Sequence, residues 1–87
     1  MASMSAGGLV LVTSSDCHLC EHARLVLGRI AAGTPLAVRE LDVESEEAKT
    51  LARAGVPLAF LPVVWDGGRV LGYGRLSERR LRRELAR

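Results

Sequence analysis

The sequence lacks any long hydrophobic run. Its longest apolar stretch, residues 56–65, is ten residues long and is interrupted by two prolines, whereas a membrane-spanning helix needs roughly 20 apolar residues. The first eight residues contain neither Lys nor Arg and precede an apolar run of only four residues, which is not the pattern of a secretory signal. We therefore expect no membrane partner, a cytoplasmic location, a flexible N-terminal tail at 1–8 and one domain at 9–87.

Positive charge is scarce in most of the chain and concentrated near its end. The 12 basic and 10 acidic residues give a net charge of +2. Residues 69–87 contain seven Arg and two Glu, a balance of +5, which leaves −3 for the rest. Such asymmetry occurs on nucleic-acid-binding surfaces, but it is more often a solvated helix face, and no nucleic-acid-reading motif accompanies these arginines. We expect no nucleic-acid partner.

Cysteine is also scarce, and its placement is informative. The two cysteines, Cys17 and Cys20, lie three residues apart. In the chain-entropy model a bridge over so short a loop stabilises the fold by only about 2 kcal/mol. On a helix, residues three apart are neighbours with Cβ atoms about 5–6 Å apart, close to disulfide geometry. The pair is therefore better explained by reversible thiol chemistry than by structural cross-linking.

The periodicity of apolar residues predicts an α/β fold. The run at 9–13 is typical of a buried strand, and apolar residues at spacings of three and four follow it in a helix that Gly33 ends. The sequence at 66–68, Asp-Gly-Gly, is a hairpin signal. The predicted order is β-α-β-α-β-β-α, a mixed four-stranded sheet packed by helices, with a parallel first pair. The expected strands are 9–13, 36–43, 62–65 and 70–73, and the expected helices are 17–32, 44–54 and 78–87.

The two cysteines are predicted to differ in reactivity. Cys17 lies at the start of the first helix, after the N-cap residue types at 14–16, where the helix dipole favours a thiolate and lowers the thiol pKa. The Asp16 carboxylate would oppose this effect, and a protonated His18 would reinforce it. Cys20 lies one turn further along, on the side of the apolar stripe, and is expected to be the less exposed, resolving thiol.

The two cysteines also allow two other interpretations. Four soft ligands, Cys17, His18, Cys20 and His22, occur within six residues. Zinc sites usually draw their ligands from two separated pairs, and the chain has no second pair, so we expect no bound metal and a solvated His22. The cysteines could also be two buried apolar residues of a helix.

Beyond the cysteines, several segments resemble a known family. A CxxC that opens a helix after a buried strand, the Pro-led segment 61–68 and the segment 39–43 are similar to the glutaredoxin-like family. The segments 61–64 and 72–81 also resemble NrdH-type redoxins. The resemblance spans residues 9–85 and implies the minimal thioredoxin fold.

The resemblance also implies an activity and a site. The expected activity is thiol–disulfide exchange on a disulfide-containing protein, with Cys17 as nucleophile and Cys20 as resolving thiol. No cofactor would be bound; glutathione as co-substrate, or a thioredoxin reductase, would supply electrons. A redox-inactive module of the same fold, which binds a partner protein or a metal, is the alternative. Leu61 and Pro62, joined by a cis peptide bond, are expected to form a platform for the substrate, with Tyr73 at its edge. His18 and Leu19 are expected to tune the redox potential.

Overall fold

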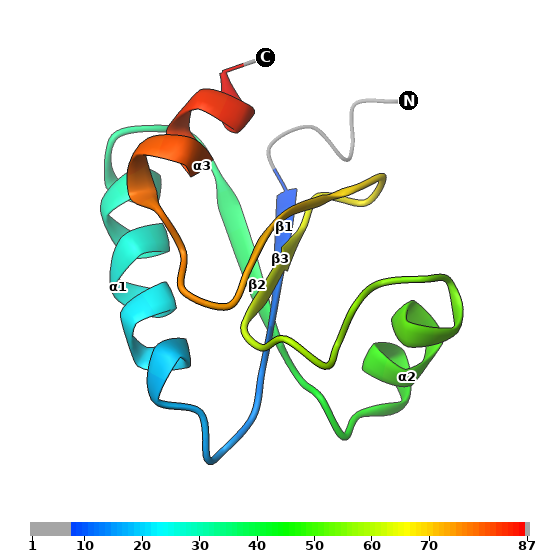
Figure 1. Ribbon diagram of the computed structural model, residues 1–87. Coiled ribbons are helices and arrows are strands. Elements are labelled where there is room, and N and C mark those ends of the chain that lie inside the picture. Colours follow the sequence, from blue (N-terminus) through cyan, green and yellow to red (C-terminus); the bar gives the residue numbers. More distant parts are fainter. Residues whose placement is uncertain (1–7, 87) are drawn as a thin grey trace.

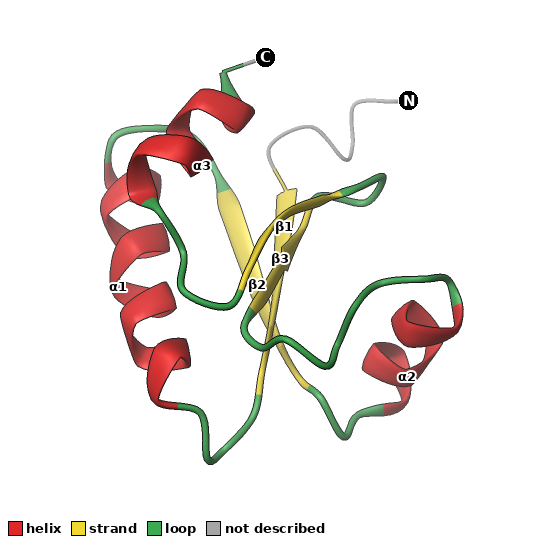
Figure 2. Cartoon of the chain, in the orientation of Figure 1, coloured by secondary structure: helices red, strands yellow, loops and turns green. Residues whose placement is uncertain are grey.

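Helices cover both faces of a four-stranded sheet in the computed structural model, which describes residues 8–86 (Figure 1, Figure 2). Helices α1 and α3 lie on one side of the sheet, and α2 lies on the other. The elements follow the predicted order β-α-β-α-β-β-α. They are β1 (Gly8–Thr13), α1 (His18–Ala32), β2 (Ala37–Asp42), α2 (Glu46–Arg53), β3 (Val63–Trp65), β4 (Val70–Tyr73) and α3 (Glu78–Leu85).

The sheet is mixed, with strand order β2-β1-β3-β4. Strand β1 runs parallel to β2 and antiparallel to β3, and β3 and β4 form an antiparallel hairpin. The parallel pair is connected through α1, as a strand–helix–strand crossover requires. This arrangement is the minimal thioredoxin-like fold, so the predicted fold class is confirmed.

Strand β1 is the centre of the core because both of its faces are covered. Leu9 and Leu11 pack into the cluster that includes side chains of α1 and α3. Val10 and Val12 pack on the opposite face, with side chains of α2. Successive side chains of a strand point to opposite faces, so a continuous apolar run fits a strand buried on both sides.

Most ends of the helices and strands differ from the predicted ends by one or two residues, for local reasons. The hydroxyl of Ser45 accepts a hydrogen bond from the backbone N–H of Ala48 at 3.1 Å, so α2 begins at Glu46 and not at residue 44. Ser77 caps α3 in the same way. Gly8, expected in the tail, is the first residue of β1. The rest of the expected tail, residues 1–7, lies outside the described residues.

The longest described helix, α1, has 15 residues. No helix between Gly8 and Ala86 combines the length and the apolar character that crossing a membrane requires.

Candidate functional site

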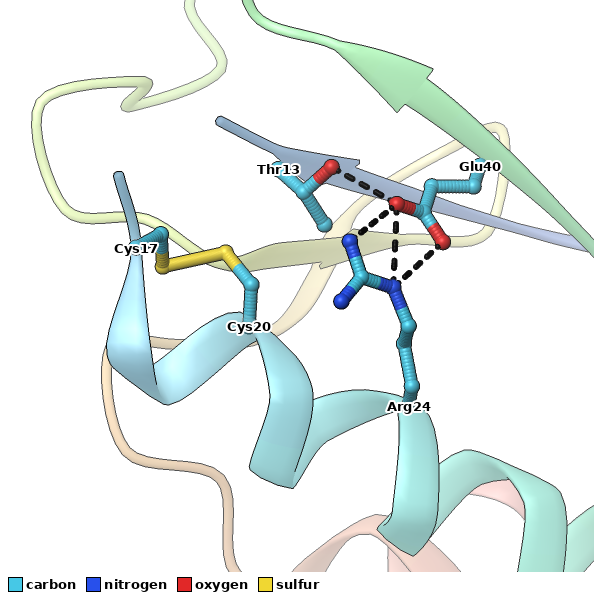
Figure 3. Close-up of a disulfide and its surroundings, with 5 residues drawn as sticks. All are labelled: Thr13, Cys17, Cys20, Arg24 and Glu40. Atoms are coloured by element: carbon cyan, nitrogen blue, oxygen red, sulfur yellow. Dashed lines mark hydrogen bonds and ion pairs between the residues drawn. A yellow bond between two sulfur atoms is a disulfide. The ribbon is translucent and has the colours of Figure 1, made fainter. Parts of the chain in front are cut away.

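The two cysteines form a disulfide at the start of α1 (Figure 3). Cys17 is the N-cap residue, with extended backbone and no side-chain capping hydrogen bond, so its sulfur is free of a capping role and is bonded to Cys20. The Cα atoms are 5.3 Å apart. Cys17 is half-buried, whereas Cys20 is completely buried. The predicted difference in exposure is confirmed, and the pair is compatible with reversible thiol–disulfide chemistry.

The segment before β3 lies at the same end of the sheet as the disulfide. The register pairs Val12 with Val63, so Pro62 is beside the end of β1, from which the loop at residues 14–16 leads to Cys17. The Leu61–Pro62 peptide bond is cis, as the resemblance implies. Pro62 is buried and Leu61 is half-buried.

Tyr73 lies at this same end and has an aromatic neighbour that the sequence analysis missed. Tyr73 is the last residue of β4, opposite Val63. Its ring centroid is 5.6 Å from that of Phe60, and the two residues are 56% and 57% exposed. The backbone N–H of Gly74 donates to the carbonyl oxygens of Phe60 and Pro62, at 3.0 and 2.9 Å, which fixes the two segments together. No local signal separates Phe60 from the rest of the apolar run in which it occurs.

The histidines of the motif region have different surroundings. His18 is exposed and Leu19 is half-buried. His22 is half-buried rather than solvated, and its Nδ1 atom is buried with no hydrogen-bond partner in the described structure. The expectation for His22 was wrong because its helix face is partly covered. Among residues 8–86, no group of three or more His, Cys, Asp or Glu side chains is placed to hold a metal ion.

A charged network connects three elements close to the disulfide (Figure 3). Glu40 of β2 accepts hydrogen bonds from Arg24 of α1 at 2.7 and 2.9 Å. It also accepts one from the hydroxyl of Thr13, the buried last residue of β1, at 2.8 Å. The hydrogen bond from Arg24 lowers the pKa of Glu40, burial opposes this shift, and Thr13 reinforces it. The network holds the end of β1 and the second turn of α1, which flank the cysteines, against β2.

The Glu40 network should make the stability of the protein depend on pH. Because the folded pKa of Glu40 is lowered, its carboxylate stabilises the fold above the unfolded pKa of about 4.3, and this stabilisation is lost as the pH falls through the folded pKa. The free energy of unfolding of Glu40→Gln should therefore be below that of the wild type at pH 7. The difference should narrow as the pH falls below about 4. Urea unfolding at a series of pH values measures it.

The control for this experiment is Glu44→Gln. Glu44 is exposed and has no ion-pair partner among the described residues. Its variant should follow the wild type at every pH. If the difference in the free energy of unfolding between Glu40→Gln and the wild type stays constant down to pH 3, the charge of the Glu40 carboxylate does not stabilise the fold.

A hollow of about 420 Å³ opens beside Cys17. Its walls are the loop at residues 14–16 and the first two turns of α1, including His18, Glu21 and Arg24. The lining contains two carboxylates, those of Asp16 and Glu21, and one guanidinium, that of Arg24. Cys17 is therefore reachable from a polar surface on one side, and the Phe60–Tyr73 pair lies at the same end of the sheet.

The chain matches no protein-family model and no curated protein.

Proposed function

We propose that the protein is a glutaredoxin-like thiol–disulfide oxidoreductase that acts as a dithiol electron carrier. The observation that carries this proposal is the disulfide between a half-buried Cys17 at the N-cap of α1 and a completely buried Cys20. A nucleophilic thiol must be reachable and stabilised as a thiolate, and the N-terminal end of a helix favours the negative charge. A resolving thiol needs only to reach its neighbour, so burial suits it.

The reaction that fits this geometry has two exchange steps. In the reduced protein, the Cys17 thiolate attacks one sulfur of a substrate disulfide, and the other substrate sulfur leaves as a thiolate. The Cys20 thiolate then attacks the sulfur of Cys17 in the mixed disulfide. The Cys17–Cys20 disulfide forms and the second substrate thiol leaves. Two electrons have passed from the protein to the substrate, and no bound cofactor takes part.

The surroundings of the cysteines support roles for the other predicted residues. The Leu61 backbone and the buried Pro62 lie where an extended substrate segment could align with the disulfide, and the exposed Tyr73 and Phe60 extend this surface with apolar area. His18, exposed between the cysteines, would stabilise the Cys17 thiolate when protonated. Leu19 occupies the other intervening position and is half-buried.

The electron donor is proposed from the resemblance. Dithiol glutaredoxins commonly have Pro-Tyr between the cysteines, where this chain has His18-Leu19. The segment 72–75, Gly-Tyr-Gly-Arg, replaces the acidic residues often found at the glutathione site. Both features favour a thioredoxin reductase over glutathione as the donor, with a disulfide-containing protein of the cytoplasm as the substrate.

Thiol trapping across a glutathione redox series tests the proposal. The protein is equilibrated at each ratio of reduced to oxidised glutathione, alkylated and weighed by mass spectrometry. We expect two thiols to disappear together, because Cys17 and Cys20 are oxidised as one couple. A transition without a glutathione adduct supports a reductase donor, and an adduct on Cys17 supports glutathione.

The Cys20→Ser variant is the internal control in this series, because it can form the adduct on Cys17 but cannot resolve it. Two free thiols that persist in the wild-type protein under oxidising conditions would contradict the proposal. They would favour the redox-inactive binding module instead.

A further inference from the structure

A hollow of about 570 Å³ runs along β4. All four residues of β4 line it, together with side chains of α3 and of the loop between β4 and α3. In the described part of the chain β4 pairs only with β3 and is therefore an edge of the sheet. An edge strand presents backbone N–H and C=O groups that an extended peptide can pair with.

The charge of this hollow is positive. Its charged lining groups are three guanidiniums, those of Arg69, Arg75 and Arg80, and one carboxylate, that of Glu84. Arg69 is bonded to Glu84 at 2.8 Å. The guanidiniums of Arg75 and Arg80 have no ion-pair partner within residues 8–86. Two positive charges are therefore left uncompensated beside a free strand edge.

Two other surfaces among residues 8–86 differ from this hollow in their charges. At the opposite edge, β2, both Arg39 and Glu40 are paired: Arg39 bonds Glu47 at 2.6 Å, and Glu40 bonds Arg24. The hollow beside Cys17 has more carboxylates than guanidiniums in its lining. An acidic partner is therefore favoured at β4 over both alternatives.

We propose that the edge of β4 binds an extended acidic segment of a partner protein, which adds to the sheet as a further strand. Its backbone pairs with β4, and its carboxylates meet Arg75 and Arg80. A nucleic acid would meet the same two arginines, but it has no peptide backbone with which to form a strand ladder along β4. One end of the bound segment would lie at Tyr73, next to Phe60 and at the disulfide end of the sheet. The inference concerns binding and goes beyond the thiol chemistry proposed above.

Fluorescence anisotropy of labelled peptides tests the proposal on the oxidised full-length protein. The probe is a peptide of about eight residues that alternates Glu and Val and contains no cysteine. A peptide with Lys in place of Glu tests charge, and one with Pro in place of Val tests strand pairing, because Pro cannot donate to a ladder. We expect binding of the Glu-Val peptide only, weakened at high salt.

Two double variants with equal changes in charge locate the binding site. The double variant Arg75→Gln/Arg80→Gln should bind the Glu-Val peptide about tenfold more weakly, because it loses two exposed ion pairs with the peptide carboxylates. Arg79→Gln with Arg83→Gln is the matched control. Like Arg80, these two arginines lie on α3 without ion-pair partners among the described residues, but they do not line the hollow. This control should change affinity less than about twofold.

Three results with the peptides would overturn the proposal: an equal loss in both double variants, equal binding of the Pro-containing peptide, or no binding of the Glu-Val peptide. Tighter binding of a single-stranded oligonucleotide than of the Glu-Val peptide would assign the arginines to nucleic acid and would also overturn it. Because the probe has no cysteine and the protein is oxidised, none of these results depends on whether the protein is an oxidoreductase.

Discussion

Cys17→Ser should abolish the reduction of a protein disulfide such as those of insulin, leaving only the rate of the buffer control. A serine hydroxyl is not ionised near neutral pH and cannot replace the thiolate that attacks the substrate. Cys20→Ser should keep the first step and stop at the second, because no thiol remains to release the mixed disulfide on Cys17. Turnover with dithiothreitol as the reductant, and mass spectrometry of the trapped adduct, measure the two effects.

The two serine variants control for each other. Each removes the same disulfide, whose contribution to stability is about 2 kcal/mol in the chain-entropy model. Cys20→Ser also places a hydroxyl at a completely buried position, so this variant should lose more stability than Cys17→Ser. The chemical difference between the two variants is the position of the remaining thiol. A mixed disulfide that accumulates on Cys20 in the Cys17→Ser variant, and not on Cys17 in the other, would reverse the assignment of nucleophile and resolving thiol.

Leu27→Ala should lower the free energy of unfolding by about 2–5 kcal/mol, the range found for large-to-small substitutions in cores. Leu27 is 2% exposed and lies in the cluster that joins α1 and α3 to the sheet. Removal of its side chain deletes buried apolar surface and leaves a cavity. Net stabilities are about 0.05–0.15 kcal/mol per residue, so this is a large part of the total for 87 residues. Urea unfolding followed by circular dichroism measures the change.

Leu25→Ala is the matched control because it makes the same substitution in the same helix. Leu25 is 61% exposed, so its replacement should change the free energy of unfolding by no more than about 0.5 kcal/mol. Helix propensity changes equally in the two variants and cancels in the comparison. Equal losses in both would show that helix propensity, and not burial of Leu27, controls the stability of this face of the sheet.

The elements and the cysteine site could be predicted because their causes are local. The capping serines, Ser45 and Ser77, and the apolar periodicity of each helix act over a few residues. The approach of Cys17 and Cys20 needs only one helical turn, so their spacing in the sequence was enough to predict that they can form a disulfide. The cis bond before Pro62 was expected from the resemblance alone, since X–Pro bonds are cis in only about 5–6% of cases.

The sequence by itself therefore determined the element order, the buried central strand and the cysteine pair at the start of α1. Only the tertiary structure decided what lies around that pair. Phe60 meets Tyr73, and Glu40 meets Arg24, because strand order and register join segments that are distant in the chain. The edge position of β4 among residues 8–86, and with it the place of Arg75 and Arg80 beside a strand edge, depends on which strands pair across the whole sheet. Non-local pairing leaves no periodic signal in the sequence, whereas helical spacing and capping do.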